Sequence, residues 1–320
     1  MSDSGNTYLV WLEWPERCFR VDAEALRFLR GLVPLGGRVV RARSERAFLR
    51  WLPKATHVVT WHFRREWFAS AKRLKVLATP GAGRELVAHE GAPKGVTVHF
   101  GGFHGQIMSE SVAGFVLAWA HGFFRPEIAE ASAEGHPWRE TWPRRALGGK
   151  CSLVAGTHAV VLGYGKVGRA IGDKLSALGV NVSGFSRRNI ADLPAAAKTA
   201  DWLVLALPSD TGTDGILGRR LISKLPRRCV VVNVGRGNAV DEAALLSALK
   251  SGRLAGAYLD VFCGEPGPLA NLGAVAASGG ILGTPADELP KSLVMMPHSS
   301  AFCSEYLRLC FKELKDEGLV

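Results

Sequence analysis

Several features that would place this chain outside the ordinary globular proteins are missing from its sequence. No stretch reaches the roughly 18 uncharged apolar residues that a membrane-spanning helix needs. The first residues lack the basic and then apolar pattern of an export signal. Internal repeats and low-complexity segments are also missing. These absences exclude membrane and repeat proteins, and they predict a soluble protein that stays in the cytoplasm.

Cysteine is scarce and scattered. No CxxC pair occurs, which excludes the paired-cysteine zinc sites and the dithiol redox motifs. Several of the six cysteines fall in apolar runs, as expected for the reduced thiols of a cytosolic protein. We therefore expect no metal site and no disulfide at Cys18, Cys151, Cys229, Cys263, Cys303 and Cys310.

The basic residues are not gathered into a tail or stripe, although the formal net charge is +11. The densest basic run covers residues 38–50, and its simplest interpretation is a solvated face on a strand and a helix. An alternative is that the positive field draws in anionic substrates and phosphate-bearing cofactors. Neither interpretation predicts nucleic-acid binding, because that requires a concentrated basic patch.

The 320 residues, 47% of them hydrophobic, are enough for two domains with cores of their own. Short apolar runs alternate with helical patterns in two series, which is typical of parallel sheets covered on both faces. We therefore predict an α/β fold with two Rossmann-like or flavodoxin-like domains. The expected strands lie in 7–12, 38–42, 57–61, 74–80 and 96–100, and then in 158–165, 181–185, 201–208, 229–235, 255–262 and 292–298.

A long and largely buried helix is predicted over residues 106–124, between the two series, where the apolar content is high and chain breakers are few. It is expected to bridge the domains. This places the first domain at residues 1–104 plus 299–320 and the second at residues 105–298.

A phosphate-binding turn is predicted at "GYGKVG", which follows an apolar run and precedes a helical pattern. Gly163 permits the tight turn, Gly165 lets the backbone approach a pyrophosphate, and Gly168 lets helix and strand pack closely. The helix N-terminus then offers N–H groups and a partial positive charge to the phosphates. We expect a bound dinucleotide to be contacted by Gly163, Tyr164, Gly165, Lys166, Val167 and Gly168.

The end of the following strand indicates which dinucleotide binds. An acidic residue there would bind the ribose hydroxyls of NAD and repel a 2'-phosphate, but Ser186 stands in its place. Arg187 and Arg188 follow, and guanidinium groups can clamp a phosphate and stack on adenine. We therefore predict that NADP(H) is preferred and NAD(H) is possible, with two surface arginines as the alternative interpretation.

Three further stretches, "VVVNVGRGNAVDEAALLSAL", "AGAYLDVFCGEP" and "MMPHSSA", follow the phosphate turn in order. Together they resemble the D-isomer-specific 2-hydroxyacid dehydrogenase family, and the similarity covers most of the chain. The resemblance implies hydride transfer between a nicotinamide cofactor and a small D-2-hydroxy or 2-oxo acid, in a cleft between the two domains. Reduction of a glyoxylate-like or hydroxypyruvate-like acid is the expected direction, in a homodimer.

The family's catalytic residues correspond to Arg236, Glu265 and His298. Arg236 would hold the substrate carboxylate and polarise its carbonyl, while His298 would move the proton. Glu265 would bind the other ring nitrogen and favour the protonated imidazole. Seen singly, each residue could instead be a structural turn residue, a surface carboxylate or a capped loop histidine.

The resemblance also implies weaker contacts. Asp260 would lie near the nicotinamide, or else cap local backbone. Further cofactor contacts are expected from Leu207, Pro208 and Thr213 and from the amides of Val234 and Gly235. Substrate contacts are expected from the backbone N–H groups of Ala82 and Gly83. Where the chain departs from the family pattern, Arg84 is either a further anion contact or a solvated loop residue, and His104 is expected to shape the substrate pocket. Trp138 and Trp142 would lie on an arm near a subunit boundary.

Two other functions are compatible with this scaffold. A formate dehydrogenase would be similar in fold, but those enzymes carry an amide where Glu265 stands. A protein of another class, a non-enzymatic NADP(H) sensor or corepressor-like protein, could retain the fold and even these residues. Turnover with 2-oxo acids would distinguish an enzyme from a non-enzymatic sensor.

Overall fold

The computed structural model describes residues 5–84, 86–124, 151–265 and 280–320. The chain divides into two compact units. Unit 1 contains residues 1–104 and 302–320, and unit 2 contains residues 105–301. Trp138 and Trp142 lie outside the described residues.

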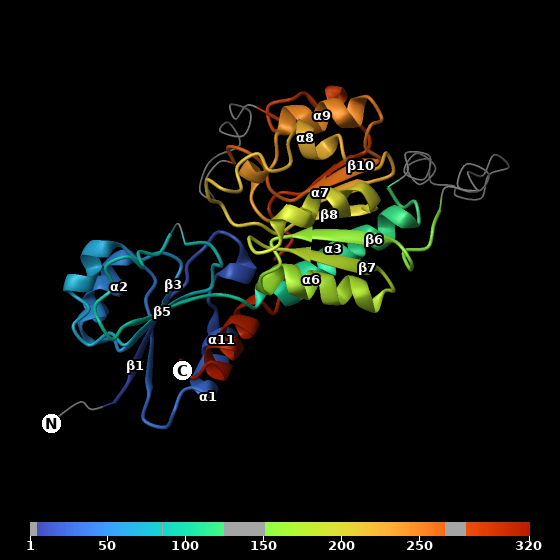
Figure 1. The fold of residues 1–320 in the computed structure, drawn as a ribbon. Helices are drawn as coiled ribbons and strands as arrows, with labels where there is room; N and C mark the ends of the chain where they lie inside the picture. The colour runs from blue at the N-terminus through green and yellow to red at the C-terminus, as the bar shows by residue number, and fades with distance from the viewer. Residues whose placement is uncertain (1–4, 85, 125–150, 266–279) are drawn as a thin grey trace. The chain divides into compact units, whose positions relative to one another are not determined.

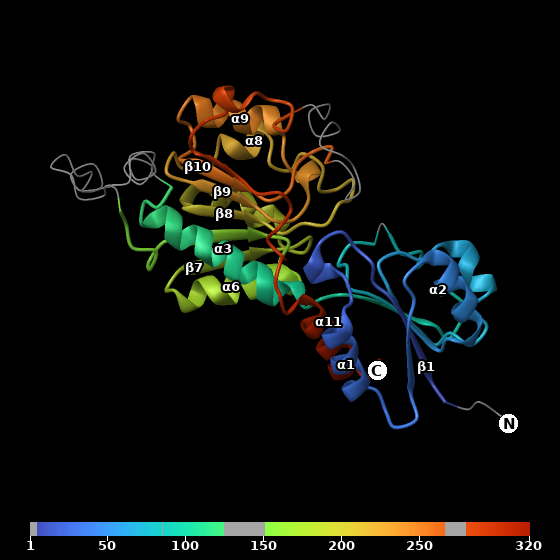
Figure 2. The same ribbon diagram turned by 180° about the vertical axis from the view of Figure 1, so that it is seen from behind.

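Unit 1 is built on a five-stranded sheet in which all neighbouring strands are parallel, in the order β2-β1-β3-β4-β5. One face of this sheet carries a core of Leu9, Val58 and Leu77 packed with Phe48 and Trp67. Helices α1 and α11 pack against each other, so the last helix of the chain returns to the first (Figures 1 and 2). The elements are β1 (Thr7–Trp11), α1 (Ala23–Leu32), β2 (Arg38–Arg41), α2 (Glu45–Trp51), β3 (His57–Thr60), β4 (Val76–Thr79), β5 (Thr97–Phe100) and α11 (Tyr306–Asp316), with short 3-10 helices at Arg17–Phe19 (η1), Leu52–Lys54 (η2) and Arg65–Ala69 (η3).

Unit 2 is built on a six-stranded parallel sheet in the order β11-β10-β9-β8-β6-β7. The strand order reverses between β6 and β8, which is the position where doubly wound sheets bind ligands at their carboxyl ends. The strands are β6 (His158–Leu162), β7 (Asn181–Phe185), β8 (Trp202–Leu205), β9 (Val230–Asn233), β10 (Gly256–Leu259) and β11 (Leu293–Met295). The helices are α3 (His104–Ala120), α6 (Lys166–Ala177), α7 (Leu193–Ala196), α8 (Arg219–Ile222) and α9 (Glu242–Lys250), with 3-10 helices at Ile190–Asp192 (η4), Ala197–Thr199 (η5), Gly237–Ala239 (η6) and Ala286–Glu288 (η7).

Helices cover both faces of the unit 2 sheet (Figures 1 and 2). Successive residues of a strand point to opposite faces, so Val160 and Val161 of β6 enter two different cores. The first core contains residues of α8 and α9, and the second contains residues of α3 and α6. Because both faces are covered, the strands are continuous apolar runs rather than alternating ones.

The structure confirms the predicted fold class, and every predicted strand is present. The long helix α3 begins two residues before its predicted start and ends at Ala120. The first unit boundary falls after His104, but the second falls after Ala301 rather than after His298. The reason is local, because the backbone N–H groups of Ser299 and Ser300 donate to Asp260 of unit 2. Among the residues described, no helix is both long and apolar enough to cross a membrane.

Candidate functional site

The three glycines of the turn between β6 and α6 serve two purposes. Gly163 has a φ of +89°, which favours glycine, and an added Cβ would lie 2.4 Å from the Ala206 carbonyl oxygen. At Gly168 an added Cβ would lie 2.2 Å from the Gly163 carbonyl oxygen. At Gly165 it would meet no atom within 4 Å. The first and third glycines therefore serve the packing of the turn, while the second leaves its approach open for a ligand.

Gly165 is also the N-cap of α6, and as a glycine it has no side chain that could cap the first N–H groups of the helix. The exposed side of the turn therefore presents the start of a 12-residue helix, where backbone N–H groups and the helix dipole favour an anion. Lys166 is exposed and Val167 is half-buried on the same turn. This arrangement fits the pyrophosphate of a dinucleotide.

The Tyr164 ring fills a slot made by two glycines. An added Cβ would lie 2.3 Å from this ring at Gly184 of β7 and 2.7 Å from its hydroxyl oxygen at Gly172 of α6. The Arg169 guanidinium lies over the ring, 5.3 Å from its centroid. The ring therefore supports an arginine of α6 at the carboxyl end of the sheet.

A tight turn follows β7 and is organised by Asn189. Its side-chain oxygen accepts the Ser186 N–H at 2.8 Å, and its amide nitrogen donates to the Gly184 carbonyl at 2.9 Å. Ser186, Arg187 and Arg188 are all exposed. The turn thus presents a hydroxyl and two guanidinium groups where the sequence predicts the adenosine end of the cofactor.

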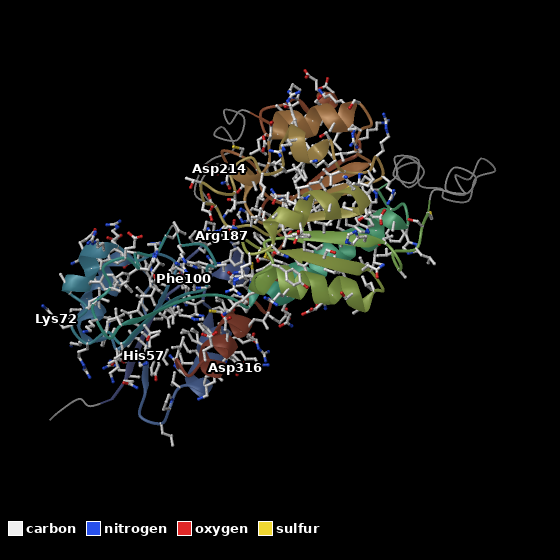
Figure 3. All side chains as sticks on the ribbon, viewed as in Figure 1. His57, Lys72, Phe100, Arg187, Asp214 and Asp316 are labelled. Atoms are coloured by element: carbon white, nitrogen blue, oxygen red, sulfur yellow. The ribbon has the colours of Figure 1, made fainter. Side chains whose placement is uncertain are left out.

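The two arginines of this turn differ in their surroundings. Arg187 donates to Asp210 at 2.5 Å, and this hydrogen bond lowers the pKa of the Asp210 carboxyl. Asp210 belongs to the segment after β8. Figure 3 shows Asp214 of that segment and Arg187 at the same end of the unit 2 sheet. Arg188 instead borders a cavity of about 410 Å³ whose other lining residues are Tyr164, Arg169, Gly184, Ser186 and Asn189. Arg188 and Arg169 are therefore the cations of this cavity.

The loop after β8 carries three predicted cofactor residues. Pro208 is exposed, whereas Leu207 is half-buried and packs against the core. The buried Thr213 hydroxyl bonds the carbonyls of Pro208 and Asp210 at 2.9 and 2.8 Å, so it stabilises the loop itself. A cofactor contact of these residues stays a prediction.

The amides of Val234 and Gly235 are already used within unit 2. Val234 N–H donates to the Leu205 carbonyl at 3.0 Å, and Gly235 N–H donates to the Asn233 side chain at 3.1 Å. A contact of these two residues with a cofactor would therefore involve other atoms than the N–H groups expected from the sequence.

Three predicted catalytic residues lie in unit 2 on segments that follow strands. Arg236 follows β9, Glu265 follows β10 and His298 follows β11. The Glu265 Oε2 atom lies 2.8 Å from His298 Nδ1, and its Oε1 atom accepts the Phe262 N–H at 2.5 Å. The carboxylate is thus held by the backbone on one side and orients the imidazole on the other.

Two charges act on His298 besides its partner. The hydrogen bond that His298 donates to Glu265 raises the pKa of His298 above its usual value, and the nearby Asp260 carboxylate acts in the same direction. The partial desolvation of the ring and the Arg236 guanidinium oppose the rise, although 55% of the His298 side chain is exposed. The Arg236 side chain is half-buried, and its Nη1 donates to the Gly235 carbonyl at 2.9 Å. The structure therefore brings a cation within electrostatic reach of an imidazole that Glu265 orients.

Backbone geometry around His298 is unusual. Its φ is +54°, and among the described non-glycine residues only this one has a positive φ. Its N–H donates to the Asp260 carbonyl at 2.9 Å, and the buried Asp260 side chain accepts the Ser299 and Ser300 N–H groups at 2.7 and 3.0 Å. Asp260 therefore caps local backbone, the second of the two roles considered for it, and contact with a cofactor stays a prediction.

The predicted substrate residues lie in unit 1. Ala82 and Arg84 are exposed and Gly83 is half-buried, in an irregular loop after β4. The Arg84 guanidinium lies over the Phe100 ring, 5.3 Å from its centroid. His104 is buried, with one ring nitrogen 3.2 Å from the Gly101 carbonyl and the other 2.7 Å from the Tyr306 hydroxyl. These bonds give His104 a structural role, and its contact with substrate stays a prediction.

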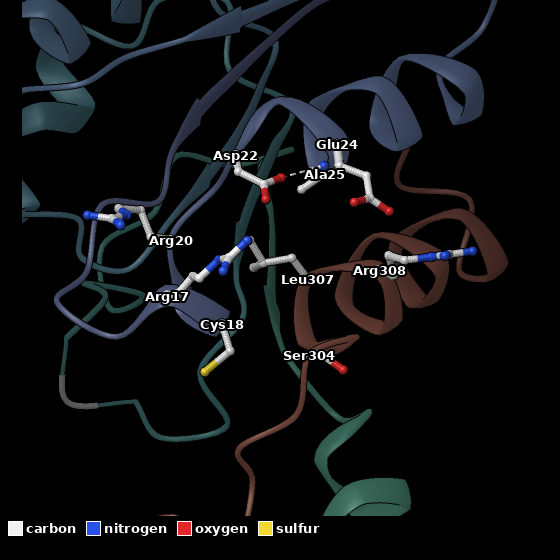
Figure 4. A pocket seen from close by; sticks show the side chains of 9 residues that line it. All are labelled: Arg17, Cys18, Arg20, Asp22, Glu24, Ala25, Ser304, Leu307 and Arg308. Carbon is white, nitrogen blue, oxygen red and sulfur yellow. Dashed lines mark hydrogen bonds between the residues drawn. The ribbon is translucent and has the colours of Figure 1, made fainter.

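Unit 1 also contains a pocket of about 490 Å³, between η1 and the first turns of α1 and α11 (Figure 4). Asp22 caps α1 by accepting the Ala25 N–H at 2.8 Å. No predicted site residue lines this pocket, whose walls are Arg17, Cys18, Arg20, Asp22, Glu24, Ala25, Ser304, Leu307 and Arg308.

Two residues of the site region escaped the sequence interpretation. Arg169 resembles any exposed helix arginine, and only its position four residues after Gly165 could have placed it near a phosphate. Glu242 resembles an ordinary acidic residue in the first turn of a helix, yet it is buried and bonded to the segment that carries Glu265.

Comparisons with known proteins agree with this geometry. A family model described as "D-isomer specific 2-hydroxyacid dehydrogenase, NAD binding domain" matches residues 124–285, half of the chain. Glycerate dehydrogenase of Methylorubrum extorquens is 31% identical over 166 residues, which cover 51% of this chain and 49% of that protein. The chain thus matches about half the length of this relative.

Solved structures extend the similarity to nearly the whole chain. A D-isomer specific 2-hydroxyacid dehydrogenase from Xanthobacter autotrophicus, in complex with NADPH and MES, is 25% identical with a TM-score of 0.71, covering 98% of this chain and 96% of its own. An NADPH-dependent glyoxylate/hydroxypyruvate reductase from Sinorhizobium meliloti, in complex with NADP and sulfate, is 26% identical with a TM-score of 0.69 and the same coverage. The present chain therefore belongs to the D-isomer specific 2-hydroxyacid dehydrogenase family.

Proposed function

We propose that this protein reduces a small 2-oxo acid to a D-2-hydroxy acid, with NADPH as the preferred hydride donor. The observation that carries the proposal is the 2.8 Å contact between Glu265 and His298, with Arg236 within electrostatic reach. All three follow parallel strands of the sheet that also carries the phosphate-binding turn. A carbonyl reduction needs these groups together, namely a proton donor and a cation beside a dinucleotide site.

The residues have distinct tasks. Glu265 occupies Nδ1 of His298, which leaves Nε2 to donate a proton to the carbonyl oxygen. Arg236 binds the substrate carboxylate and stabilises the negative charge that develops on the carbonyl oxygen. The bound nicotinamide supplies the hydride.

Cofactor preference follows from the charges around the 410 Å³ cavity. Arg188 and Arg169 attract a 2'-phosphate, and Ser186 removes the repulsion that an acidic residue would exert. Two structural neighbours named above were solved with NADPH or NADP. NAD(H) lacks the 2'-phosphate and binds more weakly.

The substrate class is drawn from the relatives. The Sinorhizobium meliloti neighbour is named a glyoxylate/hydroxypyruvate reductase and the Methylorubrum extorquens relative a glycerate dehydrogenase. The present protein acts on a similar short 2-oxo acid, with backbone N–H groups of Ala82 and Gly83 and the Arg84 side chain as further carboxylate contacts. A cytoplasmic homodimer remains the expectation from the sequence.

A spectrophotometric screen tests the proposal. NADPH oxidation is followed with glyoxylate, hydroxypyruvate, pyruvate and branched or aromatic 2-oxo acids, using the wild-type protein and His298→Ala. We expect turnover with at least one short acid and a loss of at least 100-fold in the variant, since general acid catalysis contributes on the order of 10²–10⁴ in rate. Tight NADPH binding without turnover on any acid would instead support the non-enzymatic sensor.

A further inference from the structure

Glu242 is a buried acidic residue outside the three proposed catalytic groups. It is the first residue of α9 and is only 7% exposed. Burying a carboxylate costs free energy unless hydrogen-bond donors of the protein replace the water molecules that solvate it. The donors that bind Glu242 therefore indicate its role. Both of its oxygens are bonded.

The two oxygens of Glu242 bind the chain at two places. Oε1 accepts the Cys263 N–H at 2.7 Å, and Oε2 accepts the Ile281 N–H at 2.8 Å. At Gly280, whose φ is +68°, an added Cβ would lie 2.2 Å from Oε2. One side chain of α9 thus ties together residues that precede and follow 266–279.

The segment held at Cys263 is the one that carries Glu265, two residues later. Its neighbour Phe262 donates its N–H to Glu265, and an added Cβ at Gly237 would lie 1.9 Å from the Phe262 backbone. The turn after Arg236 therefore packs directly on this segment. Hydrogen bonds and the short stretch of chain from Cys263 to Glu265 thus connect Glu242 to His298.

We propose that Glu242 is a positioning residue that fixes the Glu265–His298 pair by holding the start of the Glu265 segment. It does not touch His298 itself and acts through the backbone. A carboxylate suits this task because it presents two acceptor oxygens, one for each N–H group. A glutamine amide of the same length would place its NH₂ group against one of the two donors. The inference rests on the proposed function for its catalytic meaning.

The test uses Glu242→Gln, which keeps the shape of the side chain but presents an NH₂ group to one of the two N–H donors. We expect kcat to fall about tenfold while the Kd for NADPH is unchanged. The pKa of His298, followed by NMR titration of the labelled imidazole in the NADPH complex, should fall toward its ordinary value. Glu242→Asp should lose one of the two bonds and lie between wild type and Glu242→Gln, which provides a second variant if the first fails to fold.

Asp241→Ala is the matched control. Asp241 caps the same helix by accepting the Ala244 N–H at 2.9 Å, and among the described residues it makes no hydrogen bond to the segment that carries Glu265. This variant should lower the melting temperature and leave kcat and the pKa of His298 unchanged. If Glu242→Gln also lowers only the melting temperature, Glu242 is merely structural and the inference is overturned.

The NMR titration separates this inference from the proposed function. A protein without turnover on any 2-oxo acid would contradict the proposed function. In that protein Glu242→Gln should still lower the pKa of His298, and an unchanged pKa would contradict the positioning role.

Discussion

At the residue scale, Arg187, Arg188 and Arg169 differ in what surrounds them. Arg187 is paired with Asp210, whereas Arg188 and Arg169 border the same cavity. Arg188→Gln and Arg169→Gln should each lower kcat/KM for NADPH about tenfold, which corresponds to roughly 1.4 kcal/mol of transition-state stabilisation. Steady-state kinetics with NADPH and with NADH measures the change, and the values with NADH should alter little.

Arg187→Gln is the natural control for these two variants. It removes an exposed guanidinium from the same turn but leaves the cavity lining intact. We expect a smaller loss with NADPH than in either other variant. A larger loss would identify Arg187, rather than Arg188 and Arg169, as the main phosphate contact.

The pH dependence of reduction depends on Glu265. In the folded protein the bond to Glu265 raises the pKa of His298, so the imidazole stays protonated to a higher pH than a free histidine. Glu265→Gln should lower this pKa and move the alkaline limb of the kcat/KM profile to lower pH. A profile that does not move would show that another group donates the proton.

Arg236 should affect both substrate binding and the chemical step. It is proposed to hold the substrate carboxylate and to stabilise the developing charge, so Arg236→Gln should raise KM for the 2-oxo acid and lower kcat by at least tenfold. The Kd for NADPH, measured by fluorescence titration without substrate, should stay near the wild-type value. A normal KM would mean that another cation holds the carboxylate.

Sequence reasoning found the residues whose type and spacing carry a chemical signature. The contact between Glu265 and His298 was expected from the resemblance to the dehydrogenase family, and the structure shows the two side chains 2.8 Å apart. Glu242 escaped detection because its role depends on a contact 21 residues away along the chain. The bond between Arg187 and Asp210 was hidden for the same reason, since it joins two loops.

At the scale of elements, the turn between β6 and α6 allows a sharp test. Gly168→Ala would press a methyl group against the Gly163 carbonyl, 2.2 Å away, whereas Gly165→Ala meets no atom within 4 Å. We expect Gly168→Ala to lower the melting temperature strongly. Gly165→Ala should keep the melting temperature of the free protein but weaken NADPH binding, which isothermal titration calorimetry measures. Unchanged affinity in Gly165→Ala would contradict a close approach of the pyrophosphate.

The strands were predictable because each is short, apolar and bounded by turns, as in β8 (Trp202–Leu205) and β9 (Val230–Asn233). Element ends were less predictable. Helix α3 extends back to His104, whose ring is bonded to Gly101 and Tyr306. Such tertiary contacts leave no local signal in the sequence.

At the scale of the whole molecule, each unit has a core of its own. Phe311 of α11 is fully buried in unit 1, so Phe311→Ala should lower the stability of that unit by about 3–5 kcal/mol. Unit 2 contains the proposed NADPH site and should keep its affinity. Differential scanning calorimetry should resolve an earlier transition in the variant, and added NADPH should raise only the later one. A single transition that shifts as a whole would show that the units unfold together.

The left-handed backbone of His298 bears on whether the site catalyses a reaction. For a residue other than glycine this conformation costs roughly 1–2 kcal/mol, so on stability alone glycine or asparagine would be favoured there. A protein that only sensed a dinucleotide would be more stable with either residue. The strained imidazole lowers stability, and it fits a residue that moves a proton in a reaction.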